Sequence, residues 1–333
     1  MNNLKVLELF AGIGACSKAF ENLNIEHEIV DAVEIDKHAI ASFNQIHNTN
    51  FEPQDIRTWN KDIQCDLIMH GSPCQDFSLA GKQLGGDKDS GTRSSLMYET
   101  LRIVEKLKPK YVIWENVKNL LSKRHVHNWD AYNDYMESLG YVTYCDVMNA
   151  KDYGIPQRRE RVFTISILVE DEFLNKDYQT PTPIPLTKSI KDFLDLNESN
   201  YLTNQQLTYI LDANDVALKS GRNINNRIVN PSIAKTISCR GASDQRADVS
   251  NFVVDYPNEI VTVGELKDLW FSGEDIKVRK LTPKECWRLM GFSDLDFEKA
   301  SKVNSNTQLY KQAGNSIVVN VLEAILKNLL EVK

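Results

Sequence analysis

The 333-residue chain predicts an α/β fold: a doubly wound, mostly parallel sheet with a smaller, irregular, β-rich inserted domain. Three observations predict it. Short apolar runs alternate with helix-period segments over residues 4–168, a proline-rich stretch follows at residues 180–185, and periodic helical segments return from Leu281. Hydrophobic residues make up 42% and charged residues 26%, which excludes collagen-like, coiled-coil and wholly disordered chains.

The elements of the first part follow in chain order. The apolar runs predict strands at Lys5–Phe10, Glu28–Glu34, Cys65–His70, Lys110–Trp114 and Arg161–Leu168. The periodic segments predict helices at Gly14–Leu23, Lys37–Phe43, Leu96–Leu107 and Trp129–Leu139, the last one ended by Gly140. Strands separated by helices are typical of a parallel sheet with helices on both faces.

The pattern changes near residue 170. The stretch TPTPIP at residues 180–185 sustains neither a helix nor a central strand, so it is predicted to be a linker. Residues 187–279 are irregular, whereas Pro283–Met290 and Ile317–Leu330 again have helical periodicity. We therefore expect a catalytic and cofactor-binding domain at residues 1–179, a target-recognition domain at 187–279, and a segment at 281–333 that returns to the first domain.

Composition narrows the class of protein further. No apolar run approaches the ~18 residues of a membrane helix, and the N-terminus lacks a signal-peptide pattern, so we expect a cytoplasmic protein. The six cysteines form no C-x-x-C pair, which argues against a zinc site and a disulfide framework; we expect no bound metal. The net charge of −7 disfavours a nonspecific nucleic-acid binder but leaves room for a cleft lined by basic residues.

A predicted strand runs directly into the glycine turn Phe10-Ala11-Gly12-Ile13-Gly14, which opens a helix. Such turns let a backbone approach a ligand at a helix N-terminus, although Ser17 stands where a dinucleotide fingerprint has its third glycine. Glu34 lies 20 residues after Gly14 at the end of the second predicted strand, where an acid binds ribose hydroxyls. A surface acid is the alternative interpretation of Glu34.

Asp55 and Ile56 are assigned to the same ligand site. They are interpreted as following the third expected strand position, from which the carboxylate could reach an adenine amine. An adenosine-type ligand is therefore expected, with its identity left open by these residues alone.

A candidate nucleophile follows the strand CDLIMH, in Gly71-Ser72-Pro73-Cys74-Gln75. The strand KYVIW leads to Glu115, and the cluster QRRER, which contains Arg159 and Arg161, precedes the strand RVFTISIL. Ligands bind at the carboxyl edge of such sheets. A structural ion pair between Glu115 and one of the arginines is the alternative interpretation.

Together these groups suit attack on cytosine. A free thiol is only a few per cent ionised at neutral pH, and nearby arginines and a helix N-terminus favour the thiolate. Thiolate addition at C6 of cytosine makes C5 enamine-like, so that it attacks an electrophilic methyl group. A carboxyl group at N3 and an arginine at O2 would offset the charge that develops on the ring.

With these residues, the sequence resembles a known family, the cytosine-C5 DNA methyltransferases of bacterial and phage restriction-modification type. The resemblance covers nearly the whole chain. The motifs that carry it, in order, are FAGIG, VEID, GSPCQDFS, GTRSSLMYE, WENV, DYGIPQRRERVF, RKLTPKECWRLMGF and YKQAGNSIVVNVLEAI.

The resemblance implies a role for each matched residue. Cys74 would be the C6 nucleophile, Glu115 would contact N3 and the exocyclic amine of cytosine, and Arg161 with Arg159 would contact the base and its pocket. Residues 78–94 would form a loop that covers the flipped base. The residues implied to hold S-adenosylmethionine are Phe10, Gly12, Gly14, Glu34, Ile35, Asp55, Ile56, Asn315 and Ser316. Many relatives have an aromatic residue where this chain has Ile35, which puts one stacking contact with adenine in doubt.

The resemblance also implies a Rossmann-like S-adenosylmethionine-dependent methyltransferase fold and double-stranded DNA as the partner. A cognate restriction endonuclease in the same system is a further partner, and chemistry on one base at a time is compatible with a monomer. The target base must leave the duplex, because its C5 and C6 are not accessible to attack in the stack.

Four other classes of protein share some of these features. A dehydrogenase would share the glycine turn but gives no role to PCQ, ENV and QRRER, and an adenine methyltransferase should carry an Asp/Asn/Ser-Pro-Pro-aromatic loop that is absent. The related branch that methylates cytosine in tRNA is the alternative function, although the Cys-Phe-Thr motif by which it is recognised is absent. A methyltransferase scaffold without activity is disfavoured by the joint presence of Cys74, Glu115 and Arg161.

Overall fold

The structure is a computed structural model of the whole chain, and it describes residues 3–72, 96–169, 178–195, 200–219, 232–239, 251–255 and 262–331. Its centre is a six-stranded sheet in the order β2-β1-β3-β4-β7-β5. The strands are β1 (Leu4–Leu9), β2 (His27–Val33), β3 (Leu67–His70), β4 (Tyr111–Val117), β5 (Tyr141–Asn149) and β7 (Glu160–Leu168). The pairs of β1 with β2, β1 with β3 and β3 with β4 are parallel, and β7 runs antiparallel to β4 and β5. The prediction of a mostly parallel sheet is confirmed; β5 was not predicted.

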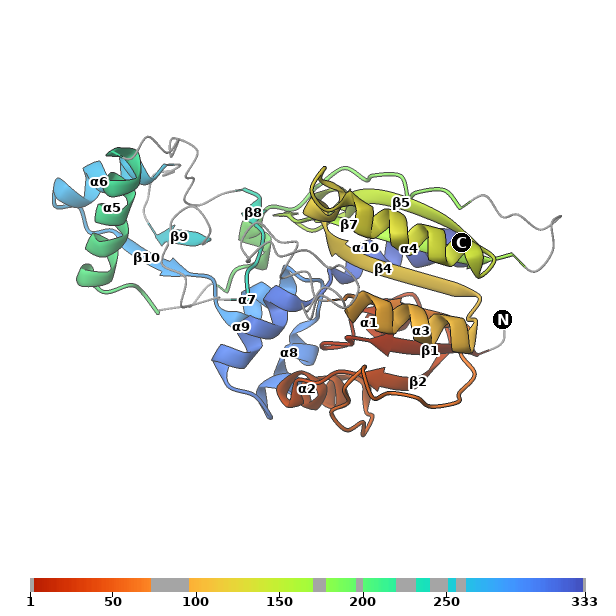
Figure 1. Cartoon of the computed structure of the whole chain (residues 1–333). Helices are drawn as coiled ribbons and strands as arrows, with labels where there is room; N and C mark the ends of the chain where they lie inside the picture. The colour runs from red at the N-terminus through yellow and green to blue at the C-terminus, as the bar shows by residue number, and fades with distance from the viewer. Residues whose placement is uncertain are drawn as a thin grey trace.

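Helices cover both faces of this sheet (Figure 1). Alternate residues of a strand point to opposite faces, so Val6 of β1 belongs to the core that contains α1 (Ala15–Asn22) and α10 (Val319–Leu330). Leu7 and Leu9 belong to the opposite core, with α3 (Met97–Leu107) and α4 (Val126–Ser138). The helix α2 (Lys37–His47) follows β2 and begins at Asp36, whose Oδ1 accepts the backbone N–H of His38 at 2.9 Å.

Residues 200–280 contribute a second cluster of buried apolar side chains, which lies to the left in Figure 1. It is built from α5 (Asn204–Lys219), α6 (Val263–Phe271) and the antiparallel pair β9 (Phe252–Asp255) and β10 (Lys277–Lys280). In the described part of this region the helices contain more residues than the strands, and the β-rich character that we expected of the whole region stays a prediction. The irregular sequence pattern concealed α5 and α6 because only part of each helix is apolar.

The chain then returns to the first sheet through four helices, α7 (Pro283–Arg288), α8 (Asp294–Ser301), α9 (Asn306–Asn315) and α10. The helix α8 packs on α2, α9 contacts both α2 and α7, and α10 packs on α1. Both chain ends lie on the same side of the molecule, at the right of Figure 1. The expected helices at Pro283–Met290 and Ile317–Leu330 are confirmed to within two residues, but α8 and α9 were not predicted.

A smaller pairing links the two parts. The two-residue strand β6 (Gln157–Arg158) pairs in parallel with β8 (Ala234–Lys235). Three short 3-10 helices complete the described elements: η2 (Lys118–Leu121), η3 (Ala150–Tyr153) and η4 (Ile190–Phe193). No helix in the described parts of the chain is long and apolar enough to span a membrane.

Candidate active site

The turn after β1 has the backbone geometry of a close ligand approach. Phe10, Gly12 and Gly14 all have positive φ, at 54°, 57° and 80°. Gly14 also has no room for a side chain, because a Cβ there would lie 2.2 Å from Nε2 of His47. The turn therefore combines a left-handed backbone with tight packing against α2 at the N-terminal end of α1.

Ser17 explains the missing third glycine. Glu8 of β1 is buried and shares the sheet face of Val6, so its carboxylate points at α1. Its Oε1 accepts the backbone N–H of Ser17 at 2.9 Å and also the Ser17 hydroxyl. Burial raises the pKa of Glu8. The helix N-terminus is thus held to the strand by a carboxylate and a hydroxyl.

Glu34 lies directly against the glycine turn. Its Oε2 accepts the backbone N–H of Gly12 at 3.0 Å, and its Oε1 accepts that of Asp36 at 2.8 Å. Burial raises the pKa of Glu34, and the neighbouring Asp36 carboxylate adds to this. The alternative of an ordinary surface acid is excluded by these contacts. The next residue, Ile35, is 66% exposed, and its side chain is open to a ligand.

The predicted place of Asp55 in the chain is wrong. We expected it after the third strand, but it lies in a turn between α2 and β3. That turn is nevertheless brought to the end of β2, because Gln54 donates its backbone N–H to the carbonyl of Glu34 at 2.8 Å. The Arg57 guanidinium binds the Asp55 carboxylate and lowers its pKa. Ile56 is buried, at 5% exposure.

Asp31, the side chain that holds the turn containing Asp55, was not identified from the sequence. The buried Asp31 of β2 accepts hydrogen bonds from the side chains of Gln54, Trp59 and Lys61 at 2.7–2.8 Å. Burial opposes ionisation of Asp31, but the Lys61, Trp59 and Gln54 contacts outweigh it and lower the pKa. An aspartate inside an otherwise apolar strand run was the signal that could have found it.

Glu115 and Arg161 form an ion pair at the carboxyl end of the parallel strands. Glu115 lies within β4, which extends past the predicted strand to Val117, and Arg161 lies near the start of the antiparallel β7. Arg161 Nε is 2.9 Å from Oε1 of Glu115, and the two side chains are 18% and 12% exposed. A Cβ at Gly71 would lie 3.7 Å from Oε2 of Glu115, so the carboxylate borders the segment after β3.

The segment after β3 is fixed by neighbouring aromatic residues. Trp114 donates its indole N–H to Oγ of the buried Ser72 at 2.9 Å, and the ring of His70 stacks on that of Trp114. Burial lowers the pKa of His70 to about 3, so the imidazole is neutral at ordinary pH. The described part of this segment therefore ends at Ser72, close to the Glu115–Arg161 pair. Cys74 and the loop 78–94 lie outside the described residues.

The other cysteines in the described parts of the chain are free thiols. Burial raises the pKa of Cys16, Cys65, Cys145 and Cys286, reaching about 12 for Cys65, which disfavours the thiolate in each of them. Cys239 is exposed. The described residues contain no cluster of His, Cys, Asp or Glu suited to a metal ion.

Arg159 is placed differently from the predicted contact with the base. It is 4% exposed, and its guanidinium donates to the carbonyls of Ile237, Gly314 and Ser316 at 3.0, 3.0 and 2.7 Å. Side chains alternate along this segment, so Arg159 turns inward while Arg158 is exposed. Of the two predicted cofactor residues in this part, Asn315 is exposed at the end of α9 and Ser316 is buried after it.

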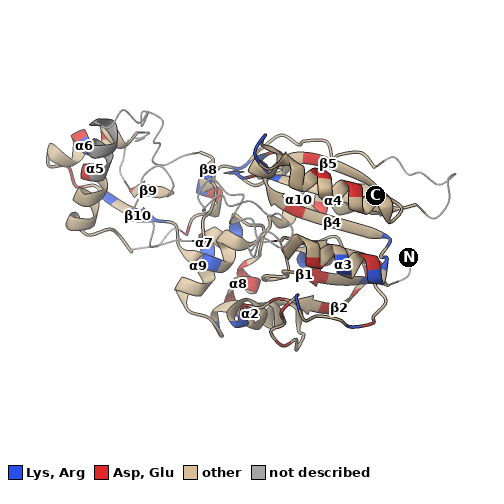
Figure 2. Cartoon of the chain, viewed as in Figure 1, with Lys and Arg blue, Asp and Glu red and all other residues tan. Residues whose placement is uncertain are grey.

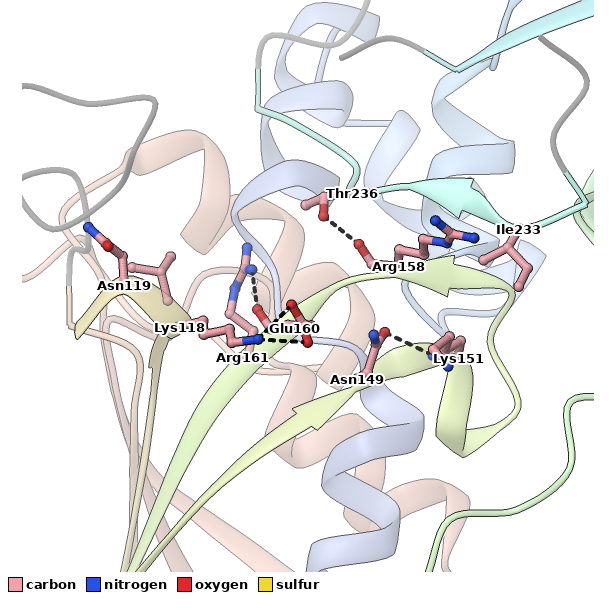
Figure 3. Close-up of a pocket in the computed structure, with 10 residues that line it drawn as sticks. Lys118, Asn119, Asn149, Lys151, Arg158, Glu160, Arg161, Ile233 and Thr236 are labelled. Carbon is pink, nitrogen blue, oxygen red and sulfur yellow. Dashed lines mark hydrogen bonds and ion pairs between the residues drawn. The ribbon is translucent and has the colours of Figure 1, made fainter. Parts of the chain in front are cut away.

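A pocket of about 630 Å³ adjoins the Glu115–Arg161 pair (Figure 3). Four of its lining residues are basic, against one acidic residue, Glu160; the basic residues are Lys118, Lys151, Arg158 and Arg161. Figure 3 shows Lys118 and Arg161 bound to Glu160, and Thr236 bound to the backbone oxygen of Arg158. In Figure 2, acidic residues are spread over outer elements such as α3, α4 and α8. The local charge of the pocket is thus opposite to the net charge of the chain.

The chain matches the family described as C-5 cytosine-specific DNA methylase over residues 4–331. It is 36% identical to the type II methyltransferase M2.ScrFI of Lactococcus lactis subsp. cremoris, covering 98% of this chain and 99% of that protein. It is 31% identical to the type II methyltransferase M.HhaI of Haemophilus parahaemolyticus, covering 99% and 95%.

Relatives also occur in phages, and the fold has solved counterparts. The orphan methyltransferase M.SPBetaI of Bacillus phage SPbeta is 29% identical, with 99% of this chain and 98% of that protein covered. The crystal structure of S. pombe Dnmt2 methyltransferase matches with a TM-score of 0.71 at 21% identity, covering 99% of both chains, which shows the fold. Since the family match spans nearly every residue, the chain belongs to the C-5 cytosine-specific DNA methylases, enzymes that use S-adenosylmethionine.

Proposed function

We propose that the protein methylates C5 of a flipped-out cytosine in a specific double-stranded DNA sequence, through a covalent bond between Cys74 and C6. The observation that carries this proposal is the Glu115–Arg161 pair at the sheet edge, beside the Gly71–Ser72 segment that leads to Cys74. Both side chains keep some exposure, and Arg161 lines a basic pocket, which supports a role in binding a substrate.

The turn after β1 fits S-adenosylmethionine. The positive φ angles of Phe10, Gly12 and Gly14 bring the backbone close to a ligand at the N-terminal end of α1. Glu34, held by the turn itself, would accept hydrogen bonds from ribose hydroxyls, and the exposed Ile35 would cover one face of the adenine. When bound, the cofactor supplies a methyl group on a positively charged sulfur.

Asp55 and Ile56 would border the adenine from the turn after α2, with the Asp55 carboxylate facing its amine. Asn315 and Ser316 would close the same site from the end of α9. Asp55 is already bound by Arg57, so its contact with adenine requires the exposed Arg57 side chain to share the carboxylate or to move.

In the proposed reaction, the Cys74 thiolate forms a bond to C6. The electron pair displaced from the C5–C6 double bond lets C5 bond to the methyl group, whose bond to sulfur breaks so that S-adenosylhomocysteine would leave. Glu115 would hydrogen-bond N3 and the exocyclic amine, and Arg161 would donate to O2, so that charge arising on the ring is stabilised. Loss of the C5 proton to a base then expels the thiolate and restores the ring. The thiols of Cys16, Cys65 and Cys286, whose pKa values are raised by desolvation, are poorly suited to the first step.

The DNA would lie between the catalytic part, residues 1–179 and 281–333, and a target-recognition part, residues 187–279. Two observations support this division: the second part has its own apolar cluster, and α10 returns to pack on α1. The basic pocket lies where the two parts meet, lined by Arg158 and Arg161 from one and by Ile233 and Thr236 from the other. It suits the phosphate backbone of the strand that carries the target base.

Methylation of tRNA cytosine is the second candidate function. It would use the same cofactor site and the same Glu115–Arg161 pair, so the two differ only in substrate. The relatives named above as type II methyltransferases cover the whole chain at 31–36% identity, which favours DNA. Their names also make a cognate restriction endonuclease a plausible partner, and we propose that the enzyme acts as a monomer in the cytoplasm.

Bisulfite sequencing of plasmid DNA tests the proposal. Plasmid from cells that express the wild-type protein should carry methylated cytosines in one short sequence context, and plasmid from cells with Cys74→Ser should carry none. Purified Cys74→Ser should still bind S-adenosylhomocysteine. Unmethylated plasmid from well-expressed wild-type protein would contradict the DNA substrate, and tRNA treated in the same way would then test the second candidate. Retained methylation by the variant would refute the role of Cys74.

A further inference from the structure

Arg159 binds the C-terminal end of α9. Its guanidinium donates to the carbonyls of Gly314 and Ser316, which lie at the last turn of that helix and just beyond it. Such carbonyls have no partner within the helix, and the helix dipole places partial negative charge there. A buried cation at this point therefore fixes the position of the helix end.

The same guanidinium holds the segment at residues 232–239, which belongs to the region between residues 187 and 279. It donates to the carbonyl of Ile237 at 3.0 Å, while Gln157 accepts the Ile237 backbone N–H at 2.9 Å. This segment crosses α9 at very close range, since a Cβ at Gly314 would lie 2.1 Å from the backbone nitrogen of Cys239. The helix end and the segment can therefore hardly move independently.

The other side of α9 is bound to the start of α2, beside Glu34. Gln312 donates to the carbonyl of His38 at 2.9 Å and accepts from the hydroxyl of Ser42 at 3.0 Å. Lys311 pairs with Asp36 at 2.6 Å. Asp36 in turn donates its backbone N–H to Glu34, so α9 spans the distance from the cofactor turn to the segment 232–239.

We propose that Arg159 is a positioning residue that makes the binding of S-adenosylmethionine and of DNA mutually dependent, by locking α9 to the segment 232–239. This rests on the proposed function. Cofactor binding restrains the end of α9 through Glu34, Asp36 and Asn315, and Arg159 transmits that restraint to the segment 232–239 of the recognition region. By linkage, DNA bound to that region strengthens cofactor binding by the same factor.

The test is the affinity for S-adenosylhomocysteine, measured by calorimetry with and without a duplex that contains the sequence found by bisulfite sequencing. In the wild-type protein the duplex should tighten binding by about 10-fold. Arg159→Met removes the donors and keeps an unbranched apolar side chain, and it should bring this factor close to 1. Its affinity without DNA should fall by a smaller factor than its affinity in the presence of the duplex. Arg159→Lys keeps the charge and should retain part of the coupling.

A second variant avoids the risk that Arg159→Met fails to fold. Lys311→Met removes a partly exposed ion pair, which contributes little to stability, and should lower the coupling by about 2- to 3-fold. Lys284→Met is its matched control, because it removes a lysine of α7 whose ion-pair partners, Asp294 and Glu298, lie in α8; its coupling should equal that of the wild type.

Two results would overturn the inference: coupling that is unchanged in both Lys311→Met and the soluble Arg159 variants, or equal loss of affinity with and without DNA, which indicates only a structural role. A wild-type protein that binds both ligands and methylates DNA with no coupling would overturn the inference while leaving the proposed function intact. A wild-type protein that neither binds S-adenosylhomocysteine nor methylates DNA would overturn both.

Discussion

Glu115 pairs with Arg161 and borders the segment that precedes the proposed nucleophile, so its substitution tests the proposed site directly. Glu115→Gln should lower kcat by about 100-fold or more if the carboxyl group donates to or accepts from the ring during the reaction. Single-turnover methyl transfer to plasmid DNA measures this. Glu105→Gln, on the exposed side of α3, is the matched control and should retain the wild-type rate. A rate within a few-fold of wild type would leave Glu115 with a structural role.

His70 ends β3, directly before the Gly71–Ser72 segment, and its burial predicts that the stability of the protein depends on pH. Its pKa of about 3 in the folded protein lies below the ~6.5 of an unfolded chain. Between these values the unfolded state binds more protons, so the free energy of unfolding falls as the pH is lowered from 7 to 5, by about 2 kcal/mol from this group.

Urea unfolding at pH 7 and pH 5 checks the contribution of His70. His70→Phe keeps a ring that can stack on Trp114 but does not titrate, so its loss of stability at pH 5 should be smaller by about that amount. Identical pH dependence in the two proteins would mean that His70 is accessible to protons in the folded state.

At the scale of elements, α9 packs very closely on the segment 232–239. This segment passes over Gly314 and leaves no space for a side chain there. Gly314→Ala should lower the free energy of unfolding by about 1–3 kcal/mol, since it forces two backbones apart. In thermal unfolding, Gly264→Ala near the start of α6 is the control; its Cβ would make an ordinary contact at 3.7 Å from Thr262. Equal effects of the two substitutions would contradict the close crossing of α9.

At the scale of the whole molecule, the two apolar clusters predict that target choice and chemistry are separable. Replacing residues 187–279 by the corresponding region of a relative with another target should change the methylated sequence and leave the cofactor affinity within about 3-fold, because Glu34 and the glycine turn remain. Bisulfite sequencing and calorimetry give the two readouts. An unchanged target sequence would place specificity outside this region. Within this region the segment 232–239 stays as in this chain, so the exchanged residues are 187–231 and 240–279, since Arg159 and Gly314 pack against the segment.

Much of the first sheet could be predicted from local patterns. Alternating apolar runs and helix periods located strands β1 to β4 and β7 and helices α1 to α4 because each of these elements buries one regular face. The glycine turn and Glu34 were recognised for a similar reason, since the turn follows the first predicted strand and Glu34 lies at the end of the second. The strand β5 was missed because its residues are mostly half-exposed, and α5 and α6 because they bury a narrow face against a small cluster.

The amino-acid sequence by itself determined most elements of the first sheet, the family and the identity of the groups that carry charge. Only the tertiary structure decided what each group touches. It separated Arg161, which pairs with Glu115, from Arg159, which binds three carbonyls, and it brought Asp55 to β2 from a turn between α2 and β3. It also showed that Gly314 has no room for a side chain, because the backbone of Cys239, 75 residues earlier, passes directly over it. The physical reason is that local periodicity reflects only which face of an element is buried, whereas these contacts join segments that are distant along the chain and depend on how the elements pack.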